Sequence, residues 1–354
     1  MTPRRVLILS ASMGAGHDGV ARELARRLTR DGAHVQVIDV IRLLPLRLGP
    51  LLRWWYRTTV QRTPLVYEIV YQVFFVRGSP VSPLARLAAR RLTALLARER
   101  PTEVVSAFHL AAQITGLMRD RGTLTAHSTV LVTDFALHRL WLHPGNDRYL
   151  CPTPETARQA TAATHRPAAA YAPLARPAFH TPPHPTGRLV LVSAGAWGVG
   201  QVTRTARVLA ASGRYTPVVL CAGNTRLRRR LTAAGLGQAL GWRDDLPDLM
   251  ARAYALVDNA AGLTCVEAFA AGLPVVSYRP IPGHGRAGAH AMARAGLTTF
   301  APDPAALLTA LDRLADPRHR AHRTAPATAL FTAPPAETLT GDPREENPAP
   351  AGGA

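Results

Sequence analysis

The sequence predicts an α/β protein built from two Rossmann-like domains whose parallel sheets face one another across a cleft. In each half of the chain, near residues 6–19 and again near 189–200, an apolar run is followed by a glycine-rich turn and a stretch of helical composition. That order is typical of parallel β–α–β units. Five prolines within residues 173–185 separate the halves, as in an interdomain linker. With 354 residues, 47% of them hydrophobic, each half can bury its own core.

Composition limits the class of protein. No apolar run reaches the roughly 18 residues of a membrane-spanning helix, and the opening run VLILSA is too short for a signal peptide. We therefore expect a cytoplasmic location, or a peripheral one on the inner face of the cell membrane. Cys151, Cys221 and Cys265 lack metal-ligand spacing, so neither a disulfide framework nor a zinc site is expected. The net charge of +19 indicates an anionic partner such as nucleic acid, a phospholipid surface or a phosphorylated substrate.

Residues 6–40 are predicted to open the N-terminal domain with a strand, a glycine-rich turn, a helix and a second strand. In the turn, Gly14, Gly16 and Gly19 match the dinucleotide fingerprint G-x-G-x-x-G. Asp39 ends the second strand, where a ribose-binding acid can lie. The residues alone therefore leave an NAD-dependent enzyme as an alternative. A second domain with its own glycine-rich turn has no role in that alternative.

The segment 42–77 is the least regular part of this half. Its leucines and tryptophans keep helical spacing, and arginines outnumber acids eleven to two over residues 41–100. A basic amphipathic segment with tryptophan and tyrosine suits a membrane interface. Packing on the N-terminal domain is an equally good interpretation of the residues alone. The candidates for membrane contact are Arg53, Trp54, Trp55 and Arg57.

Two predicted strands end on residues that can carry chemistry. Residues 103–108 deliver His109, and residues 130–133 deliver Asp134. The carboxyl ends of such strands line the ligand crevice of an open α/β sheet. Asp134 can act as a base, orient a neighbouring group, or merely cap the end of its strand. His138 has a second histidine five residues further on but no third partner, so no metal site is expected.

The stretch 257–280 is the most informative part of the C-terminal half. It contains a buried strand, a turn of small residues, a helix that Gly272 and Pro274 end, and another strand. The helix N-terminus aims unpaired amides at whatever lies above the turn, which suits an anion. Glu267 stands three residues after Thr264. Either the pair forms a capping box, or the carboxylate accepts hydrogen bonds from sugar hydroxyls.

The predicted domain boundaries follow from these elements. Residues 1–172 form the N-terminal domain, 173–186 the linker, and 187–316 the C-terminal domain, which ends with a helix. Beyond it, residues 317–354 are rich in Pro, Ala, Thr and Arg. That composition predicts a largely disordered tail.

Several spaced motifs resemble known enzymes. The small-residue turn and the run T-x-x-E-A-x-x-x-G-x-P-x-V after it resemble the nucleotide-sugar signature of the two-domain GT-B glycosyltransferases. The run S-x-x-x-G-x-G-H, which ends at His17, is similar to the N-terminal motif of the monogalactosyldiacylglycerol synthase and processive diacylglycerol glucosyltransferase family, of glycosyltransferase family 28 type. The resemblance extends from residue 4 to about residue 300.

The resemblance implies a displacement with inversion, in which an acceptor hydroxyl attacks the anomeric carbon of a UDP-sugar and UDP leaves. It implies that His17 or Asp134 deprotonates the acceptor, a membrane lipid with diacylglycerol first, and that Gly14, Gly16 and His109 line the cleft. It further implies contact with an anionic membrane surface, and neither nucleic acid, cofactor nor catalytic metal. The residues that it implies for the UDP-sugar are Gly195, Gly198, Asn224, Gly262, Leu263, Thr264 and Glu267. Three further candidates do not follow from the resemblance: His284 and Arg286 for the sugar or the diphosphate, and Arg243 for the diphosphate.

The chain departs from this family within residues 280–289. The family carries P-G-Q-E-x-x-N, with Gln and Glu on the donor sugar, whereas here the corresponding positions hold His284, Gly285 and Gly288. The sequence therefore leaves the donor sugar open. It also leaves open a glycosyltransferase that acts on a soluble natural product, a UDP-sugar epimerase, and a nucleotide- or lipid-binding protein without activity.

Overall fold

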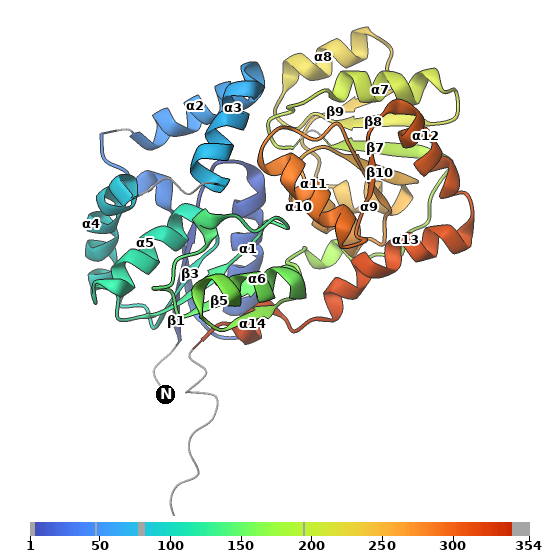
Figure 1. Cartoon of the computed structure of the whole chain (residues 1–354). Coiled ribbons are helices and arrows are strands. Elements are labelled where there is room, and N and C mark those ends of the chain that lie inside the picture. Colours follow the sequence, from blue (N-terminus) through green and yellow to red (C-terminus); the bar gives the residue numbers. More distant parts are fainter. Residues whose placement is uncertain (1–3, 47, 77–81, 194, 342–354) are drawn as a thin grey trace, which may run out of the picture.

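The structure is a computed structural model that describes residues 4–46, 48–76, 82–193 and 195–341. It has two lobes, drawn blue to green and yellow to red in Figure 1, and each contains a six-stranded sheet. Every strand pairing within the two sheets is parallel. The predicted α/β architecture with two parallel sheets is confirmed.

The N-terminal sheet has the strand order β2-β1-β3-β4-β5-β6. Its central strands are buried almost throughout, because helices cover both faces of a parallel sheet. The strands are β1 (Arg5–Ser10), β2 (His34–Asp39), β3 (Glu103–Ser106), β4 (His127–Leu131), β5 (Arg148–Cys151) and β6 (Ala168–Ala170). The helices are α1 (Ala15–Arg30), α5 (His109–Asp120), η3 (Arg139–Trp141) and α6 (Pro154–Thr164).

Between β2 and β3, the described part of the chain contributes helices and no strand. These are η1 (Val40–Leu43), α2 (Leu48–Arg62), α3 (Pro64–Val70), the π-helical η2 (Tyr71–Val76) and α4 (Ser82–Glu99). In Figure 1, α2 and α3 rise from the N-terminal lobe towards the C-terminal lobe. A small apolar cluster joins them to that lobe, and it contains Val60, Tyr67, Val199 and Ile281.

The C-terminal sheet has the strand order β12-β11-β10-β7-β8-β9. Its strands are β7 (Leu189–Ser193), β8 (Thr216–Leu220), β9 (Gln238–Leu240), β10 (Ala255–Asp258), β11 (Val275–Tyr278) and β12 (Thr299–Ala301). After the linker, which contains η4 (Pro177–Phe179), the helices are α7 (Val202–Ala211), α8 (Thr225–Ala233), α9 (Leu246–Arg252), α10 (Leu263–Ala270), α11 (His284–Arg294) and α12 (Pro304–Arg313).

The C-terminal segment contradicts the predicted disorder over its described part. It forms α13 (Pro317–Ala329), η5 (Leu330–Thr332) and α14 (Ala336–Leu339). Asp316 accepts a hydrogen bond from the Arg318 amide at the start of α13, and Pro317 occupies the first turn, where its missing N–H costs nothing. The Arg320 guanidinium lies 4.5 Å from the centroid of the Tyr254 ring. A composition typical of disorder thus folds because its arginines and alanines find partners on the C-terminal domain.

The same segment returns to the N-terminal lobe, where Figure 1 shows α14 beneath α6. Ala336 is fully buried there, and the Ala172 amide donates to the Pro334 carbonyl at 2.9 Å. The Gly341 amide donates to the Glu103 carboxylate on β3 at 2.9 Å. The chain therefore crosses between the lobes twice, and the predicted tail beyond residue 341 lies outside the described residues.

Candidate active site

A cavity of about 970 Å³ lies between the two domains. Most of the candidate residues line it. From the N-terminal domain these are Gly14, Gly16, His17, His109 and Asp134, and from the C-terminal domain Gly195, Arg243, Gly262, Leu263, Thr264, Glu267 and His284.

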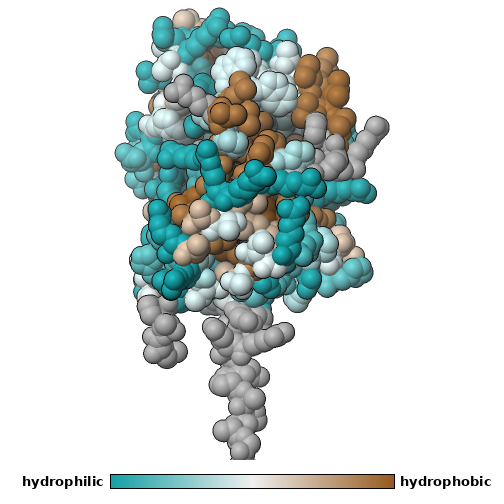
Figure 2. Space-filling model, turned by 90° about the vertical axis from the view of Figure 1, so that its left-hand side faces the viewer, coloured by the Kyte–Doolittle hydropathy of each residue, from teal (hydrophilic) through white to brown (hydrophobic). Residues whose placement is uncertain are grey.

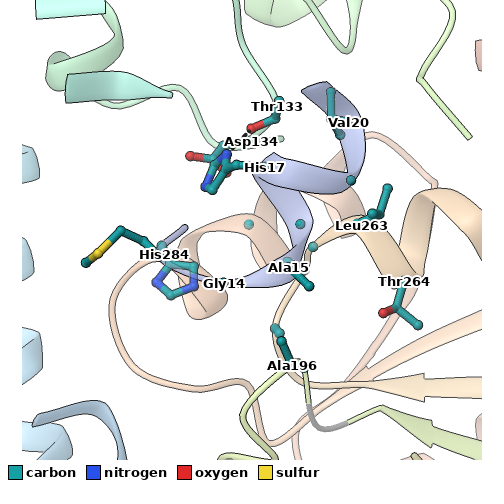
Figure 3. A pocket seen from close by; sticks show the side chains of 18 of the residues that line it. Gly14, Ala15, His17, Val20, Thr133, Asp134, Ala196, Leu263, Thr264 and His284 are labelled. Atoms are coloured by element: carbon teal, nitrogen blue, oxygen red, sulfur yellow. Dashed lines mark hydrogen bonds between the residues drawn. The ribbon is translucent and has the colours of Figure 1, made fainter. Parts of the chain in front are cut away.

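Two helix N-termini, those of α1 and α10, meet at this cavity (Figure 3). A Cβ placed on Gly19 would lie 2.5 Å from Leu263 Cδ2, and one on Gly16 would lie 3.7 Å from Leu263 Cβ. Glycine therefore lets the helices approach closely. Both N-cap residues, Gly14 and Gly262, lack a capping side chain, so first-turn amides and the positive ends of two helix dipoles remain available to an anion.

His17 lies in the first turn of α1. Its Nδ1 is 2.9 Å from the Thr133 hydroxyl, which Figure 3 marks, and its ring meets Phe108 edge-on with 5.0 Å between the centroids. Burial lowers the pKa of His17, although Asp134 acts in the opposite direction. The imidazole is consequently neutral at neutral pH, as a general base must be.

Asp134 follows β4 and is held by two side chains. Its Oδ2 accepts a hydrogen bond of 2.9 Å from Trp141 Nε1 and lies 3.4 Å from His138 Nε2. Burial disfavours the charged form, but the neighbouring imidazoles and the indole outweigh burial, so the pKa of Asp134 lies below its ordinary value. A carboxylate with a lowered pKa has a low proton affinity and is therefore a poor base. It suits the orienting role better, and its contacts are with side chains rather than with the amides that a cap would bind.

His109 and His138 complete the imidazole cluster, with 5.3 Å between their ring centroids. Nδ1 of each is buried and has no hydrogen-bond partner among the described residues. Burial and the neighbouring imidazoles hold the pKa of His109 well below its ordinary value. Within the described ranges no group of three His, Cys, Asp or Glu side chains could hold a metal ion.

Glu267 lies in α10, and the position of the helix start decides whether it forms a capping box with Thr264. The helix begins after Gly262, so Thr264 is inside the first turn and does not cap it. The capping-box interpretation is therefore wrong. Burial raises the pKa of Glu267 to about 7, with Arg176 acting in the opposite direction. Across the described chain this carboxyl has neither a hydrogen bond nor an ion pair, and it lines the cavity.

Three candidates for the UDP-sugar lie outside the cavity lining. Asn224 Nδ2 donates to the Trp197 and Gly198 carbonyls at 3.2 and 3.1 Å, and its Oδ1 accepts from the Leu227 amide. Asn224 thus caps α8 and braces the glycine-rich turn. Gly198 packs on it, since a Cβ there would lie 2.7 Å from Asn224 Cβ. The third, Arg286, is 3.5 Å from Glu68 on α3.

Arg243 does line the cavity, but it is exposed and both its Nε and Nη2 donate to the Asp245 carboxylate. Asp245 stands at the N-cap of α9, but its side chain pairs with Arg243 and does not cap the helix. A ligand phosphate must therefore compete with Asp245 for the guanidinium.

Comparison with known proteins finds similar glycosyltransferases. Residues 17–172 match the family model described as monogalactosyldiacylglycerol (MGDG) synthase. The chain is similar to the processive diacylglycerol beta-glucosyltransferase of Bacillus subtilis (strain 168), with 26% identity over 315 residues that cover 80% of this chain and 79% of the relative. The enzyme of the same description from Bacillus pumilus is 24% identical, covering 82% and 81%. The chain is thus similar to glycosyltransferases of this description over most of its length.

Solved structures of similar fold cover nearly the whole chain. Acinetobacter baumannii MurG has a TM-score of 0.59 and 15% identity, covering 95% of this chain and 97% of its own. The spinosyn rhamnosyltransferase SpnG, complexed with thymidine diphosphate, has a TM-score of 0.62 and 14% identity, covering 95% and 98%. At this identity the likeness concerns the fold alone, which is GT-B.

The departures from the family motif in residues 284–288 have a steric reason. A Cβ on Gly285 would come closer than 3.0 Å to Ile281 Cγ1, and one on Gly288 would lie 2.7 Å from Ala261 Cβ. Helix α11 therefore packs directly on the turn that precedes α10, and neither position admits the longer side chain of the family. His284 keeps its place on the cavity wall.

The four residues predicted to meet a membrane lie on α2 and are exposed. Trp54 is 63% exposed, and Trp55, at 38%, also reaches the cavity. Further exposed apolar side chains extend the surface over α3, namely Leu65, Val66 and Ile69. Figure 2 shows hydrophobic side chains gathered in the upper part of this face, with long hydrophilic ones crossing below them. Among the described helices none is both long and apolar enough to span a bilayer.

Sequence reasoning missed several residues of the site. His138 and Trp141 follow Asp134 at positions i+4 and i+7, and this spacing could have identified them as its partners. Asp258 at the end of β10 accepts from the Ala260 and Ala261 amides at 2.9 and 2.6 Å and so shapes the turn before α10. An acid before a small-residue turn was a usable signal. Tyr67 gave none.

Proposed function

We propose that this chain is an inverting glycosyltransferase that moves a hexose from a UDP-sugar to a hydroxyl of a membrane lipid, with diacylglycerol as the first acceptor. The observation that carries the proposal is the placement of His17 and Glu267 on one cavity: a neutral imidazole on one wall, and an unpaired carboxyl beside a free helix N-terminus on the other. The family supports the reaction type, and its members are described as diacylglycerol glycosyltransferases.

In the proposed mechanism, His17 accepts the proton of the acceptor hydroxyl as its oxygen attacks the anomeric carbon. The C–O bond to the diphosphate breaks on the opposite side of the sugar ring, which inverts the anomeric configuration. Asp134 stabilises the imidazolium that forms, since its charge already raises the proton affinity of His17. General-base help of this kind is worth on the order of 10²–10⁴ in rate.

The leaving UDP is held by the C-terminal domain. First-turn amides of α10, at Leu263 and Thr264, lie at the positive end of the helix dipole and stabilise the diphosphate. The Glu267 carboxylate accepts hydrogen bonds from the ribose hydroxyls. Burial raises the pKa of Glu267 because the charged carboxylate loses its solvation. Hydrogen bonds from the ribose hydroxyls replace that solvation in the complex. No step of this mechanism requires a metal ion.

The acceptor is proposed to enter from a bilayer that contacts α2 and α3. Trp54, Leu65 and Ile69 offer exposed apolar area, and Arg53 and Arg57 stand beside them on α2. Such a surface suits the headgroup region of an anionic membrane. The proposed location is therefore peripheral, on the inner face of the cell membrane.

The test is mass spectrometry of lipids after purified protein is incubated with mixed vesicles and either UDP-glucose or UDP-galactose, with EDTA present. A glycosylated diacylglycerol is expected, which would identify donor and acceptor together. A sugar product that forms only without EDTA would overturn the metal-independent mechanism. Absence of any glycolipid, with UDP still bound, would overturn the lipid acceptor.

A further inference from the structure

One contact joins the two domains directly on the cavity wall. Tyr67 on α3 places its hydroxyl 2.6 Å from Nδ1 of His284, the first residue of α11. Tyr67 is only 1% exposed, and the hydroxyl of Tyr56 on α2 lies 3.3 Å from its own. The three side chains form a line of hydrogen bonds from α2 through α3 to α11.

The protons along this line can be assigned from chemistry. Burial raises the pKa of both phenols, that of Tyr56 to about 12, so both keep their hydrogens. Burial lowers the pKa of His284 to about 4, so its imidazole is neutral, with one N–H and one lone pair. Because an imidazole nitrogen is a stronger base than a phenol oxygen, Nδ1 accepts from Tyr67. The hydrogen of the ring therefore sits on Nε2.

That N–H is available to a ligand. In the described chain Nε2 of His284 has no hydrogen-bond partner, and the residue lines the cavity together with His17 and Asp134. Figure 3 shows the His284 ring near Gly14, on the side of the cavity where His17 lies. A donor in a cavity is satisfied only by water or by an acceptor on the ligand.

The start of α11 is fixed in this position. The Gly283 amide donates to the Glu68 carboxylate at 2.8 Å. A Cβ on Gly283 would lie 2.7 Å from Tyr67 Cε1, and its φ of +69° is one that glycine adopts without strain. Glu68 is committed to this amide and lies 3.5 Å from Arg286. Residue 285 is glycine, and α11 carries no acid, so this helix places no carboxylate beside His284.

We propose that Tyr67 is a positioning residue of the donor-sugar site: it holds His284 so that Nε2–H donates a hydrogen bond to a hydroxyl oxygen of the hexose. This inference rests on the proposed function. The N-terminal domain thereby completes a pocket that otherwise belongs to the C-terminal domain. The sugar is recognised here by a single neutral donor from α11, instead of an amide and a carboxylate.

The experiment measures the dissociation constants of UDP, UDP-glucose and UDP-galactose by calorimetry for the full chain and for Tyr67→Phe, His284→Ala and their double variant. We expect unchanged UDP affinity in all four proteins. For the sugar nucleotide that the wild type binds more tightly, each single substitution should weaken binding by about 3- to 10-fold, the worth of one hydrogen bond. Tyr67→Phe should add nothing in the His284→Ala background, since Tyr67 acts through His284.

Two further variants separate positioning from a general loss of structure. His284→Gln keeps an N–H near the position of Nε2 and should restore most of the lost affinity. Tyr254→Phe also removes a buried hydroxyl, which donates to the Leu311 carbonyl at 3.1 Å outside the cavity. It should lower the melting temperature without changing sugar-nucleotide affinity.

The outcomes distinguish this inference from the proposed function. A wild type that does not bind UDP overturns the proposed function itself. Normal UDP binding, with sugar-nucleotide affinity equal in the wild type and His284→Ala, overturns the inference and leaves the function standing. Equal effects of Tyr67→Phe in both backgrounds, or an equal effect of Tyr254→Phe, likewise overturn the role of Tyr67.

Discussion

The two domains share one architecture but differ at one edge of the sheet. In the C-terminal sheet the order β9-β8-β7-β10-β11-β12 is that of a complete doubly wound nucleotide-binding fold. In the N-terminal sheet β2 is the last described strand on the corresponding edge, and the chain continues as α2, α3, η2 and α4 before β3. Helices therefore follow β2 at the point in the chain where the C-terminal domain forms its third strand, β9. Those helices carry the exposed tryptophans and also reach the C-terminal domain.

The two domains also contribute different kinds of side chain to the cavity. The N-terminal domain contributes His17, His109, His138 and Asp134, which can hold or move a proton. The C-terminal domain contributes the N-terminus of α10 and Glu267, which suit a nucleotide. In the proposed mechanism the N-terminal domain moves the proton and the C-terminal domain binds the nucleotide, so variants in the two domains should change different quantities.

The largest effect should come from His17→Ala. We expect transfer to fall by about 10²–10⁴, because the general base is lost. UDP affinity should stay within about twofold, since mutations away from a bound group leave its contacts intact. Initial rates with UDP-sugar and lipid vesicles, beside calorimetry with UDP, check both. His34→Ala, an exposed histidine at the start of β2, is the matched control. Loss of UDP binding in His17→Ala would break the division between the domains.

Glu267→Ala should show the converse pattern. Loss of hydrogen bonds to a charged acceptor should weaken UDP binding by about 10- to 100-fold. Because the pKa of Glu267 is raised to about 7 and ribose hydroxyls favour its ionised form, UDP-glucose affinity should rise with pH through that range. Glu267→Gln should flatten this rise. Calorimetry between pH 6 and 8 tests the pair, and an unchanged pH dependence in Glu267→Gln would exclude the carboxyl from the ribose site.

Membrane binding by α2 and α3 can be tested separately from proton transfer and nucleotide binding. The double variant Leu65→Glu with Ile69→Glu replaces side chains that are 79% and 63% exposed. We expect binding to anionic vesicles to weaken by about 10- to 100-fold, because each apolar side chain loses its transfer energy. Val37→Glu, on the edge strand β2 and 40% exposed, is the control. Vesicle sedimentation at two salt concentrations measures the effect, and equal losses in both proteins would contradict a specific surface.

The smallest effect concerns stability. Burial lowers the pKa values of His17, His109 and His284, the last to about 4. Between the unfolded value of 6.5 and the folded one, the unfolded chain binds protons that the folded chain does not. The free energy of unfolding should therefore fall as pH is lowered through this window, and His284 contributes on the order of 1 to 3 kcal/mol of that fall.

Urea unfolding at pH 7.5, 6 and 4.5 measures this loss. In His284→Gln the fall should be smaller by the share of that imidazole, and His17 and His109 should still produce a decline. A wild type whose free energy of unfolding rises towards pH 4.5 would show that these imidazoles are not held neutral by the fold.

Sequence reasoning succeeded where a short stretch decides the geometry. The order of strand, small-residue turn and helix places His17 in the first turn of α1 and Glu267 one turn into α10, because only a few residues separate each side chain from the turn before its helix. His109 and Asp134 likewise follow strand ends, those of β3 and β4, as predicted. Sequence reasoning failed for the C-terminal segment, since composition does not reveal that Arg320 packs on Tyr254 and that Ala336 is buried against the other lobe.

By itself, then, the sequence determined two parallel α/β domains, the family motifs and the residues at the ends of local elements. Only the tertiary structure decided that Asn224 braces a turn, that Asp134 is committed to Trp141, and that Tyr67 bonds to His284. The last two residues stand 217 positions apart. Periodicity and capping act over a few residues, whereas a hydrogen bond across two domains exists only once both cores have packed and set the helices side by side.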